Sequence, residues 1–336
     1  MPGQHGGRQH DRSRQHDRSR HNDRPRHNDR LRRLRAGDRV SVVAPAGPVA
    51  PDLLDKGVAI LSAWGLDVRL GTYVHARHPR FDYLAGTDGQ RAEDLTRAWC
   101  DPETVAVFCA RGGYGAMRTL DLLDWDALAA APAKVFTGSS DITALHQVIG
   151  SRLRIPTVFG AMVGSGSFVD DPVAQDNLRR MLFAPDAGVL LESPRAAPLV
   201  PGRARGIAVG GNLSLVASGA GVPEIAPPPP GAIALLEDVT EEPYRIDRYL
   251  SHLRRAGWFR NVAGIALGSW VDCGELADVR EVLSDRLGDL GVPIVWELGF
   301  GHCRGQLAVP LGSEVELESD AQTGTARLRL TEPALA

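Results

Sequence analysis

Between residues 39 and 149, short apolar runs alternate with segments of helical character, and this alternation constrains the fold more than any other feature. Apolar runs closed by glycine or proline are typical of buried strands, whereas apolar residues three or four positions apart indicate helices. The predicted strands are 39–45, 66–68, 105–109 and 135–137, and the predicted helices are 51–65, 89–100, 115–123 and 142–149. The pattern predicts a parallel α/β sheet with both faces covered, whose ligands gather at the carboxyl ends of the strands.

The pattern changes after Val158. Residues 166–205 contain five prolines and are expected to form an irregular connecting segment. Strands are expected at 206–209, 232–236, 264–268, 307–310 and 315–318, and helices at 247–256 and 279–287. With 336 residues there is room for two domains. We therefore expect an N-terminal α/β domain over 36–165 and a smaller mixed α/β domain over 206–332.

Residues 1–35 differ in composition from the rest. Four six-residue units, QHDRSR, QHDRSR, HNDRPR and HNDRLR, run from Gln9 to Arg32. With almost no apolar side chains, such a segment cannot offset the entropy lost on ordering, so a disordered tail is predicted. A histidine metal tract or a tether to an anionic surface is the functional alternative. We favour a dispensable extension.

Composition narrows the class of protein. The four cysteines have no metal-finger spacing, so neither a disulfide framework nor a metal site is expected. The formal net charge of -3 divides into about +7 for residues 1–35, from eleven Arg and four Asp, and therefore about -10 for the remainder. The sequence contains neither an apolar spanning segment nor a signal-peptide core. A cytoplasmic protein that binds neither membrane nor nucleic acid is predicted.

Arg111-Gly-Gly-Tyr-Gly115 follows the predicted strand 105–109. Consecutive glycines let backbone N–H groups point at one spot, and the start of the next helix adds positive potential. The loop is therefore a candidate for holding an oxyanion or a phosphate. It lacks the Lys-Ser/Thr of a phosphate loop, and a tight turn without a ligand is the alternative.

A second motif, Phe136-Thr-Gly-Ser-Ser-Asp-Ile-Thr143, joins a predicted strand to a predicted helix. Its Gly138 lies two residues before Ser140, as in the nucleophile elbow of serine hydrolases. The usual second glycine is replaced by Ile142. Because Ser139, Ser140 and Asp141 are also good N-cap residues, helix capping alone is an equally valid interpretation.

Two later segments offer partners for a serine. Glu237 and Asp238 end an apolar run, and His302 follows Gly299-Phe300-Gly301. A serine hydroxyl needs a base to take its proton, and the base needs a carboxylate to orient it. Ser140, Glu237 and His302 occur in the chain order of α/β hydrolases and form a candidate triad.

The chain resembles the LD-carboxypeptidases, a serine peptidase family that also includes the microcin C self-immunity peptidases. The resemblance rests on ordered motifs across residues 43–312, nearly all of the expected globular chain. These motifs are Val43-Ala-Pro45, Arg111-Gly-Gly-Tyr-Gly115, Gly138-x-Ser140-Asp141-x-Thr143, Gly210-Gly-Asn-Leu213, Leu236-Glu-Asp238, Glu242-Pro-Tyr-Arg245, Gly301-His302 and Pro310-Leu-Gly312. Ser139 departs from the pattern, since an aromatic residue or histidine commonly precedes the nucleophile.

The resemblance implies a flavodoxin-like N-terminal domain bearing Ser140 as nucleophile, and a C-terminal domain bearing His302 as base and Glu237 as its orienting acid. It also implies an oxyanion hole from the backbone N–H groups of Gly113 and Asp141. Family members are generally homodimers and need no cofactor.

The implied reaction releases the terminal D-Ala of a murein tetrapeptide during peptidoglycan recycling. Arg111, Tyr114 and Arg245 are candidate substrate-binding residues, although Arg245 can equally pair with neighbouring acids. Cleavage of aminoacyl-nucleotide antibiotics is the alternative within the family. A non-catalytic nucleotide- or sugar-binding module and a cysteine enzyme using Cys109 or Cys303 are alternatives from other classes.

Overall fold

The computed structural model describes residues 31–336. The predicted repeat tail falls almost entirely on residues 1–30 and so lies outside the described residues. The packed chain begins before the expected domain start at residue 36, because Leu31 and Leu34 are buried in the core. The Arg33 N–H also donates to the carbonyl of the C-terminal Ala336 at 2.8 Å, so the two ends of the described chain lie side by side.

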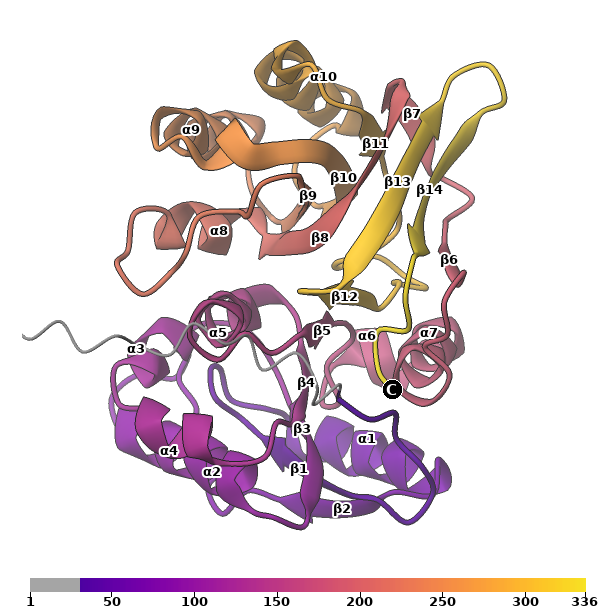
Figure 1. Cartoon of the computed structure of the whole chain (residues 1–336). Coiled ribbons are helices and arrows are strands. Elements are labelled where there is room, and N and C mark those ends of the chain that lie inside the picture. The colour runs from indigo at the N-terminus through magenta and orange to yellow at the C-terminus, as the bar shows by residue number, and fades with distance from the viewer. Residues whose placement is uncertain (1–30) are drawn as a thin grey trace, which may run out of the picture. The chain divides into compact units, whose positions relative to one another are not determined.

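The first sheet has six strands in the order β12-β5-β4-β3-β1-β2 (Figure 1). They are β1 Arg39–Val43, β2 Asp67–Leu70, β3 Thr104–Cys109, β4 Val135–Gly138, β5 Thr157–Phe159 and β12 Val309–Leu311. Strands β1 to β5 are parallel, and their order 2-1-3-4-5 is that of flavodoxin-like folds. The predicted fold class is confirmed. The last strand, β12, comes from the C-terminal half and pairs antiparallel with β5.

Helices cover both faces of this sheet, as expected for a buried parallel sheet. They are α1 Pro51–Ala63, α2 Asp88–Cys100, α3 Ala116–Leu120, α4 Trp125–Ala130, α5 Thr143–Val148, α6 Gly166–Val169 and α7 Pro172–Phe183. Leu54 and Leu61 of α1 belong to the core on one face, whereas Leu95 of α2 and Leu145 of α5 belong to the core on the other. Among residues 31–336, no helix is both long and apolar enough to cross a membrane.

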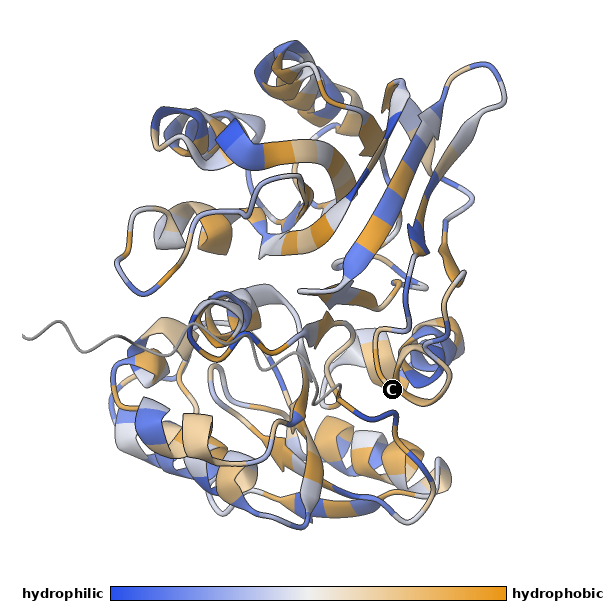
Figure 2. Ribbon diagram, in the orientation of Figure 1, coloured by the Kyte–Doolittle hydropathy of each residue, from blue (hydrophilic) through white to orange (hydrophobic). Residues whose placement is uncertain are grey.

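The second sheet has eight strands in the order β6-β14-β13-β8-β9-β10-β11-β7. They are β6 Leu190–Leu191, β7 Ala197–Val200, β8 Gly202–Asn212, β9 Ala232–Val239, β10 Val262–Val271, β11 Ile294–Trp296, β13 Glu314–Asp320 and β14 Thr325–Leu330. Strands β8 to β11 are parallel, and the outer pairs are antiparallel. Polar and apolar residues alternate along β13 (Figure 2), and buried positions alternate with partly buried ones, because successive side chains of a strand point to opposite faces of the sheet.

Helices α8 Leu213–Gly219, α9 Pro243–Arg255 and α10 Leu276–Leu287 pack on one face of β8 to β11. Short 3-10 turns follow α9 and α10, at Trp258–Asn261 and Gly288–Leu290. The other face of the parallel strands joins the core that is shared with α1 and α7. The strand β9, near whose carboxyl end Glu237 lies, is therefore packed on both faces.

The expectation of an irregular segment over 166–205 is wrong for its first half, which contains α6 and the twelve-residue helix α7. Asp171 caps α7 by accepting from the backbone N–H groups of Val173 and Ala174 at 3.1 Å, and Pro172 occupies the first turn. Proline fits this position because its missing N–H would have no helical partner there. The prolines therefore mark the start and the end of a helix rather than its absence.

Candidate active site

Ser140 lies directly after β4, where the chain turns through a 3-10 turn, Ser140–Ile142, into α5. Its φ is 59°, in the left-handed region that residues other than glycine rarely adopt. Such a conformation costs about 1–3 kcal/mol and persists where the surrounding structure enforces it. The strand, strained turn and helix have the geometry of a nucleophile elbow. The turn leaves Ser140 partly exposed, whereas Ser139 is buried.

The glycine loop approaches this turn closely. A Cβ atom added to Gly112 would lie 2.9 Å from the Cβ and 3.2 Å from the Oγ of Ser140. Gly113, next in the loop, has a φ of 96°. Only glycine at 112 allows this approach without displacing the serine. The structure thus brings together the glycine loop and the serine, as the sequence predicted.

Asp141 links the serine turn to the end of the glycine loop. Its carboxylate is buried and accepts from the backbone N–H of Ala116, at the start of α3, at 2.7 Å. Burial raises the pKa of Asp141 to about 6, although the Ala116 N–H and the charge of Arg91 oppose this rise. The side chain therefore positions the loop, while the backbone N–H of Asp141 is the group predicted to donate to an oxyanion.

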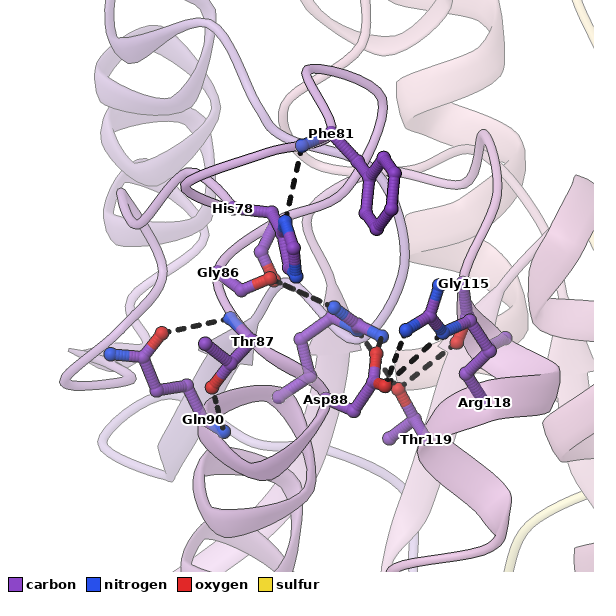
Figure 3. A network of polar contacts seen from close by, with 12 residues as sticks. His78, Phe81, Gly86, Thr87, Asp88, Gln90, Gly115, Arg118 and Thr119 are labelled. Carbon is purple, nitrogen blue, oxygen red and sulfur yellow. Dashed lines mark hydrogen bonds and ion pairs between the residues drawn. The ribbon is translucent and has the colours of Figure 1, made fainter.

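A network of polar contacts around Asp88 and Thr119 reaches the Gly115 end of the glycine loop (Figure 3). Arg91 is 2% exposed and donates to Thr119 Oγ1 at 3.0 Å, to two backbone carbonyls and to Asp88. Thr119 in turn donates to the carbonyl of Gly115 at 3.1 Å, and Asp88 also pairs with Arg118 at 2.7 Å. The network connects α2 to the end of the glycine loop.

We expect Arg91→Met to reduce the free energy of unfolding by about 3 kcal/mol, because it removes one buried donor from Thr119, from Asp88 and from two backbone carbonyls. The midpoint of urea-induced unfolding measures this loss. Arg118→Met is the matched control, since its side chain is 36% exposed and an exposed pair contributes about 1 kcal/mol or less. Equal midpoints for the two variants would show that the Arg91 network does not stabilise the fold.

Glu237 and His302 form a hydrogen-bonded pair. Glu237, near the carboxyl end of β9, is fully buried, and its Oε2 lies 2.8 Å from His302 Nδ1. Nδ1 must carry the proton that bonds to the carboxylate, so Nε2 is left as the basic nitrogen. Burial opposes the charged imidazolium, but the neighbouring carboxylate of Glu237 outweighs it and raises the pKa of His302.

Glycine is also required beside this pair. A Cβ at Gly301, whose φ is 104°, would lie 2.3 Å from Glu237 Oε2 and would occupy the place of the carboxylate. A Cβ at Gly268 on β10 would lie 2.9 Å from the Cβ of Glu237. Glycines from two segments therefore make room for the Glu237 side chain and for the His302 loop.

Asp238 is the neighbouring carboxylate, but it does not contact His302. Its oxygens accept from Asn212 Nδ2 at 2.7 Å and from the backbone N–H of Ser214 at 2.9 Å, so it holds the start of α8. Burial and the charge of Glu237 raise the pKa of Asp238 to about 7. Both carboxylates of the sequence motif contact the Asn212 amide, but only Glu237 bonds to His302.

Asn212 and Thr143 connect the two sheets at the site, a function that the sequence did not assign to them. The backbone N–H of Asn212 donates to Thr143 Oγ1 at 3.0 Å, and its side chain lies 3.4 Å from Glu237 Oε1. Thr143 begins α5, three residues after Ser140. Contacts therefore run continuously from the serine turn through Asn212 to Glu237 and His302. The only available signal was the Gly-Gly-Asn sequence at the end of a strand.

The predicted substrate-binding residues all have contacts within the protein. Arg111 donates to the carbonyl of Pro48 at 2.8 Å, and Arg245 lies 3.7 Å from Glu241. Tyr114 is 49% exposed and packs edge-on against Tyr83. Their contribution to substrate binding stays a prediction.

The cysteine alternative is disfavoured by burial. Both Cys109 and Cys303 are buried, and burial raises the pKa of each thiol, well above its ordinary value for Cys109. The thiolate is the nucleophilic form, so these environments suppress the reactive species.

The fold and the site define a class of protein: a two-lobed α/β protein with a serine on a strained turn and a buried carboxylate–histidine pair. Residues 40–160 match the model of the LD-carboxypeptidase N-terminal domain, and residues 205–317 match that of the LD-carboxypeptidase C-terminal domain. The chain therefore belongs to the LD-carboxypeptidase family and is a serine-type peptidase.

Individual relatives agree. A Streptomyces coelicolor protein named as a carboxypeptidase is 52% identical over 303 residues, which cover 90% of this chain and 96% of the relative. The murein tetrapeptide carboxypeptidase of Pseudomonas aeruginosa is 34% identical over 84% of this chain and 94% of its own length. The microcin C7 self-immunity protein, solved in complex with glutamyl sulfamoyl guanosine, superposes with a TM-score of 0.80 over 91% of this chain and 99% of its own, at 22% identity.

Proposed function

We propose that this protein releases the terminal D-Ala of a murein tetrapeptide by hydrolysing the amide bond between an L-centre and D-Ala, in the cytoplasm during peptidoglycan recycling. The observation that carries the proposal is the 2.8 Å contact between Glu237 and His302, joined through Asn212 to the strained turn of Ser140. The 34% identity to a murein tetrapeptide carboxypeptidase supports the substrate.

In the proposed acylation, His302 Nε2 takes the proton of Ser140 as its Oγ attacks the scissile carbonyl carbon. Glu237 stabilises the imidazolium that forms. The oxyanion accepts hydrogen bonds from the backbone N–H groups of Gly113 and Asp141. Removing one such donor typically raises the activation free energy by about 2.7–4 kcal/mol. The C–N bond then breaks, and the imidazolium gives its proton to the departing nitrogen of D-Ala.

In deacylation, a water molecule attacks the ester carbonyl carbon while His302 takes one of its protons. The ester C–O bond breaks, the proton returns to Ser140, and the shortened peptide leaves as a carboxylate. The nucleophile comes from the N-terminal domain over 36–165 and the acid–base pair from the C-terminal domain over 206–332. Arg111, Tyr114 and Arg245 are the residues we propose for substrate contacts, and the enzyme is proposed to be a homodimer.

Incubation with tetrapeptides that contain either L-Lys or meso-diaminopimelate, followed by mass spectrometry of D-Ala, tests this function. An aminoacyl sulfamoyl adenylate is assayed in parallel. We expect D-Ala release from at least one tetrapeptide and no cleavage of the adenylate. Cleavage of the adenylate alone would instead support the antibiotic-cleaving activity, and no turnover of any substrate would refute the peptidase proposal.

A chain lacking residues 1–30 is expected to retain full turnover in the same assay. The deletion ends at residue 30 because Leu31 and Leu34 belong to the core. A large loss of activity would show that the repeat tail is not dispensable. A purely binding module is disfavoured because it needs neither a serine at positive φ nor a buried glutamate–histidine pair.

A further inference from the structure

A cavity of about 330 Å³ is lined by both lobes of the protein, and none of the residues of the proposed mechanism lines it. Part of its wall comes from α5 and the π-helical turn that follows, Ile149–Leu153, in the lobe of the first sheet. The rest comes mainly from β8 and the segment 225–229, in the lobe of the second sheet (Figure 1). Its apolar side chains include Ile155, Ile207, Val209, Ile225, Trp258 and Leu311. Mainly apolar clefts of about 300–1,000 Å³ are typical of small-molecule sites.

The β8 part of the wall is a stretch of sheet that the protein leaves partly uncovered. β8 is an interior strand, with β13 and β9 as its neighbours. Ala208 points to one face of the sheet and is fully buried, whereas Ile207 and Val209 point to the other face and stay partly exposed. Moving such apolar surface out of water is favourable. A ligand with an apolar body therefore gains free energy by covering these two side chains.

The volume of the cavity limits the size of the ligand. An apolar cavity of about 150 Å³ is enough to bind benzene. At about 330 Å³, this cavity has room for a body of about two fused rings or for an alkyl chain of similar volume. The N-terminal tail does not fit this lining, because the apolar side chains of residues 1–30 are Met1 and two prolines.

Arg154 is the one charged side chain among the described residues that line the cavity. It is exposed, and within residues 31–336 its guanidinium has neither an acidic partner nor a hydrogen bond. Its φ is 56°, a conformation that usually places glycine at the end of a helix, so capping does not explain an arginine here. Because a guanidinium binds a carboxylate through two parallel hydrogen bonds, the cavity favours a ligand with one carboxylate.

Ser151 provides a second donor near Arg154. Its Oγ accepts from the backbone N–H of Ala226 at 2.9 Å, and no residue within 31–336 accepts its hydroxyl hydrogen. A hydroxyl has one hydrogen to donate besides its acceptor sites, so this hydrogen is available to a ligand oxygen. Ser151 and Arg154 are three residues apart at the end of the π-helical turn. The donors therefore gather at one part of the lining, and the remainder is apolar.

His146 also lines the cavity, but it adds no charge. Its Nε2 lies 3.0 Å from the carbonyl of Gly138, which can only accept, so Nε2 carries the proton and Nδ1 accepts from Thr157 Oγ1 at 2.8 Å. Burial lowers the pKa of His146 to about 4, so the ring is neutral at neutral pH. Gly138 is two residues before Ser140. A ligand in the cavity therefore touches the side chain that holds the strand of the nucleophile.

We infer that this cavity binds a small apolar monocarboxylate, whose carboxylate pairs with Arg154 and Ser151 and whose hydrocarbon body covers Ile207 and Val209. The ligand contacts both lobes, so its binding stabilises their association. The body is either an aromatic ring system or an alkyl chain, and the probes below distinguish the two. The inference does not rest on the proposed function, because it concerns residues outside the catalytic groups.

Isothermal titration calorimetry with the full chain tests this inference with three probes: 2-naphthoate, its uncharged analogue naphthalene-2-carboxamide, and decanoate. We expect one 2-naphthoate or decanoate per chain, and about tenfold weaker binding of the carboxamide, because it loses the charge-assisted bonds to Arg154. Tighter binding of 2-naphthoate than of decanoate would identify a ring system as the body, and the reverse order would identify an alkyl chain.

Arg154→Gln should weaken binding of 2-naphthoate about tenfold and leave the carboxamide unchanged. Arg152→Gln is the matched control and should bind all probes as the wild type does. Arg152 is also exposed, but its guanidinium lies 5.4 Å from the centre of the Trp125 ring and does not line the cavity. Val209→Trp fills the cavity and should abolish binding of all three probes, and its urea-induced unfolding shows whether it folds. If it does not fold, the Arg154→Gln comparison alone decides.

Absence of binding of both carboxylates at millimolar concentration would overturn the inference. Equal affinities of the wild type for 2-naphthoate and the carboxamide would do the same. A tenfold gain in affinity on deletion of residues 1–30 would make the tail the occupant, and binding that requires dissociation of a dimer would make a second copy the occupant. Either result contradicts a small-molecule site. No turnover is measured, so each of these outcomes leaves the proposed D-Ala release standing.

Discussion

Replacing Ser140 with alanine is expected to lower kcat/KM for D-Ala release by about 10⁵-fold, because the attacking oxygen is lost and the remaining groups only bind and polarise the substrate. Mass-spectrometric quantification of D-Ala gives the rate. Ser139→Ala is the matched control. Ser139 is buried and makes no side-chain capping bond, so we expect less than a tenfold change. If Ser139→Ala lost the activity and Ser140→Ala kept it, the nucleophile would be Ser139.

Stability provides a second readout of the same residue. Because φ at position 140 is 59°, glycine adopts this backbone without strain, whereas alanine does not. We expect Ser140→Gly to be as inactive as Ser140→Ala but more stable than it by about 1 kcal/mol in urea-induced unfolding. Equal stabilities would mean that the turn is relaxed and that no strain is retained for catalysis.

Replacing Glu237 with glutamine is expected to lower kcat by about 10⁴-fold, because an amide cannot fix the required tautomer of His302 or stabilise the imidazolium. The pH profile supplies an independent measurement. The base must be neutral, so activity is lost as the pH falls through the pKa of His302, which the Glu237 carboxylate raises above its usual 6.5. The acidic limb of wild-type kcat/KM should therefore lie above pH 6.5 and move to lower pH in Glu237→Gln.

Asp238→Asn is the control for this prediction, because Asp238 is also buried but contacts Asn212 and Ser214 instead of the imidazole. It should reduce the free energy of unfolding and shift the acidic limb less than Glu237→Gln does. An acidic limb at the same pH in wild type and Glu237→Gln would show that His302 is not the titrating base.

Much of the first sheet could be predicted because its strands and helices each show a recognisable pattern in their own stretch of sequence. Each buried strand is a short apolar run closed by glycine or proline, as in Arg39–Val43, and each covering helix carries its own apolar face. The prediction failed over 166–205, where proline content was interpreted as irregularity. There Asp171 and Pro172 begin a helix, and apolar residues at Ala174, Leu178 and Met181 repeat at helical spacing. Strands β11 and β14 were also missed. β11 has only three residues, whereas the polar and apolar residues of β14 alternate at the strand period, so its sequence carried a signal that the prediction overlooked.

The sequence by itself determined which residues could take part in the site: a serine after a strand, a pair of acids after another, and a histidine beside glycines. It predicted Glu237 as the partner of His302, but not that Asp238 holds the start of α8 or that Asn212 joins the lobe of the serine to the lobe of the acid. The physical reason is that chain order fixes which residues exist at strand ends, whereas contacts between residues 25 to 69 positions apart depend on how the strands pair and how the two sheets pack. Only the tertiary structure could also reveal the positive φ of Ser140, because neighbouring segments force the backbone into that conformation.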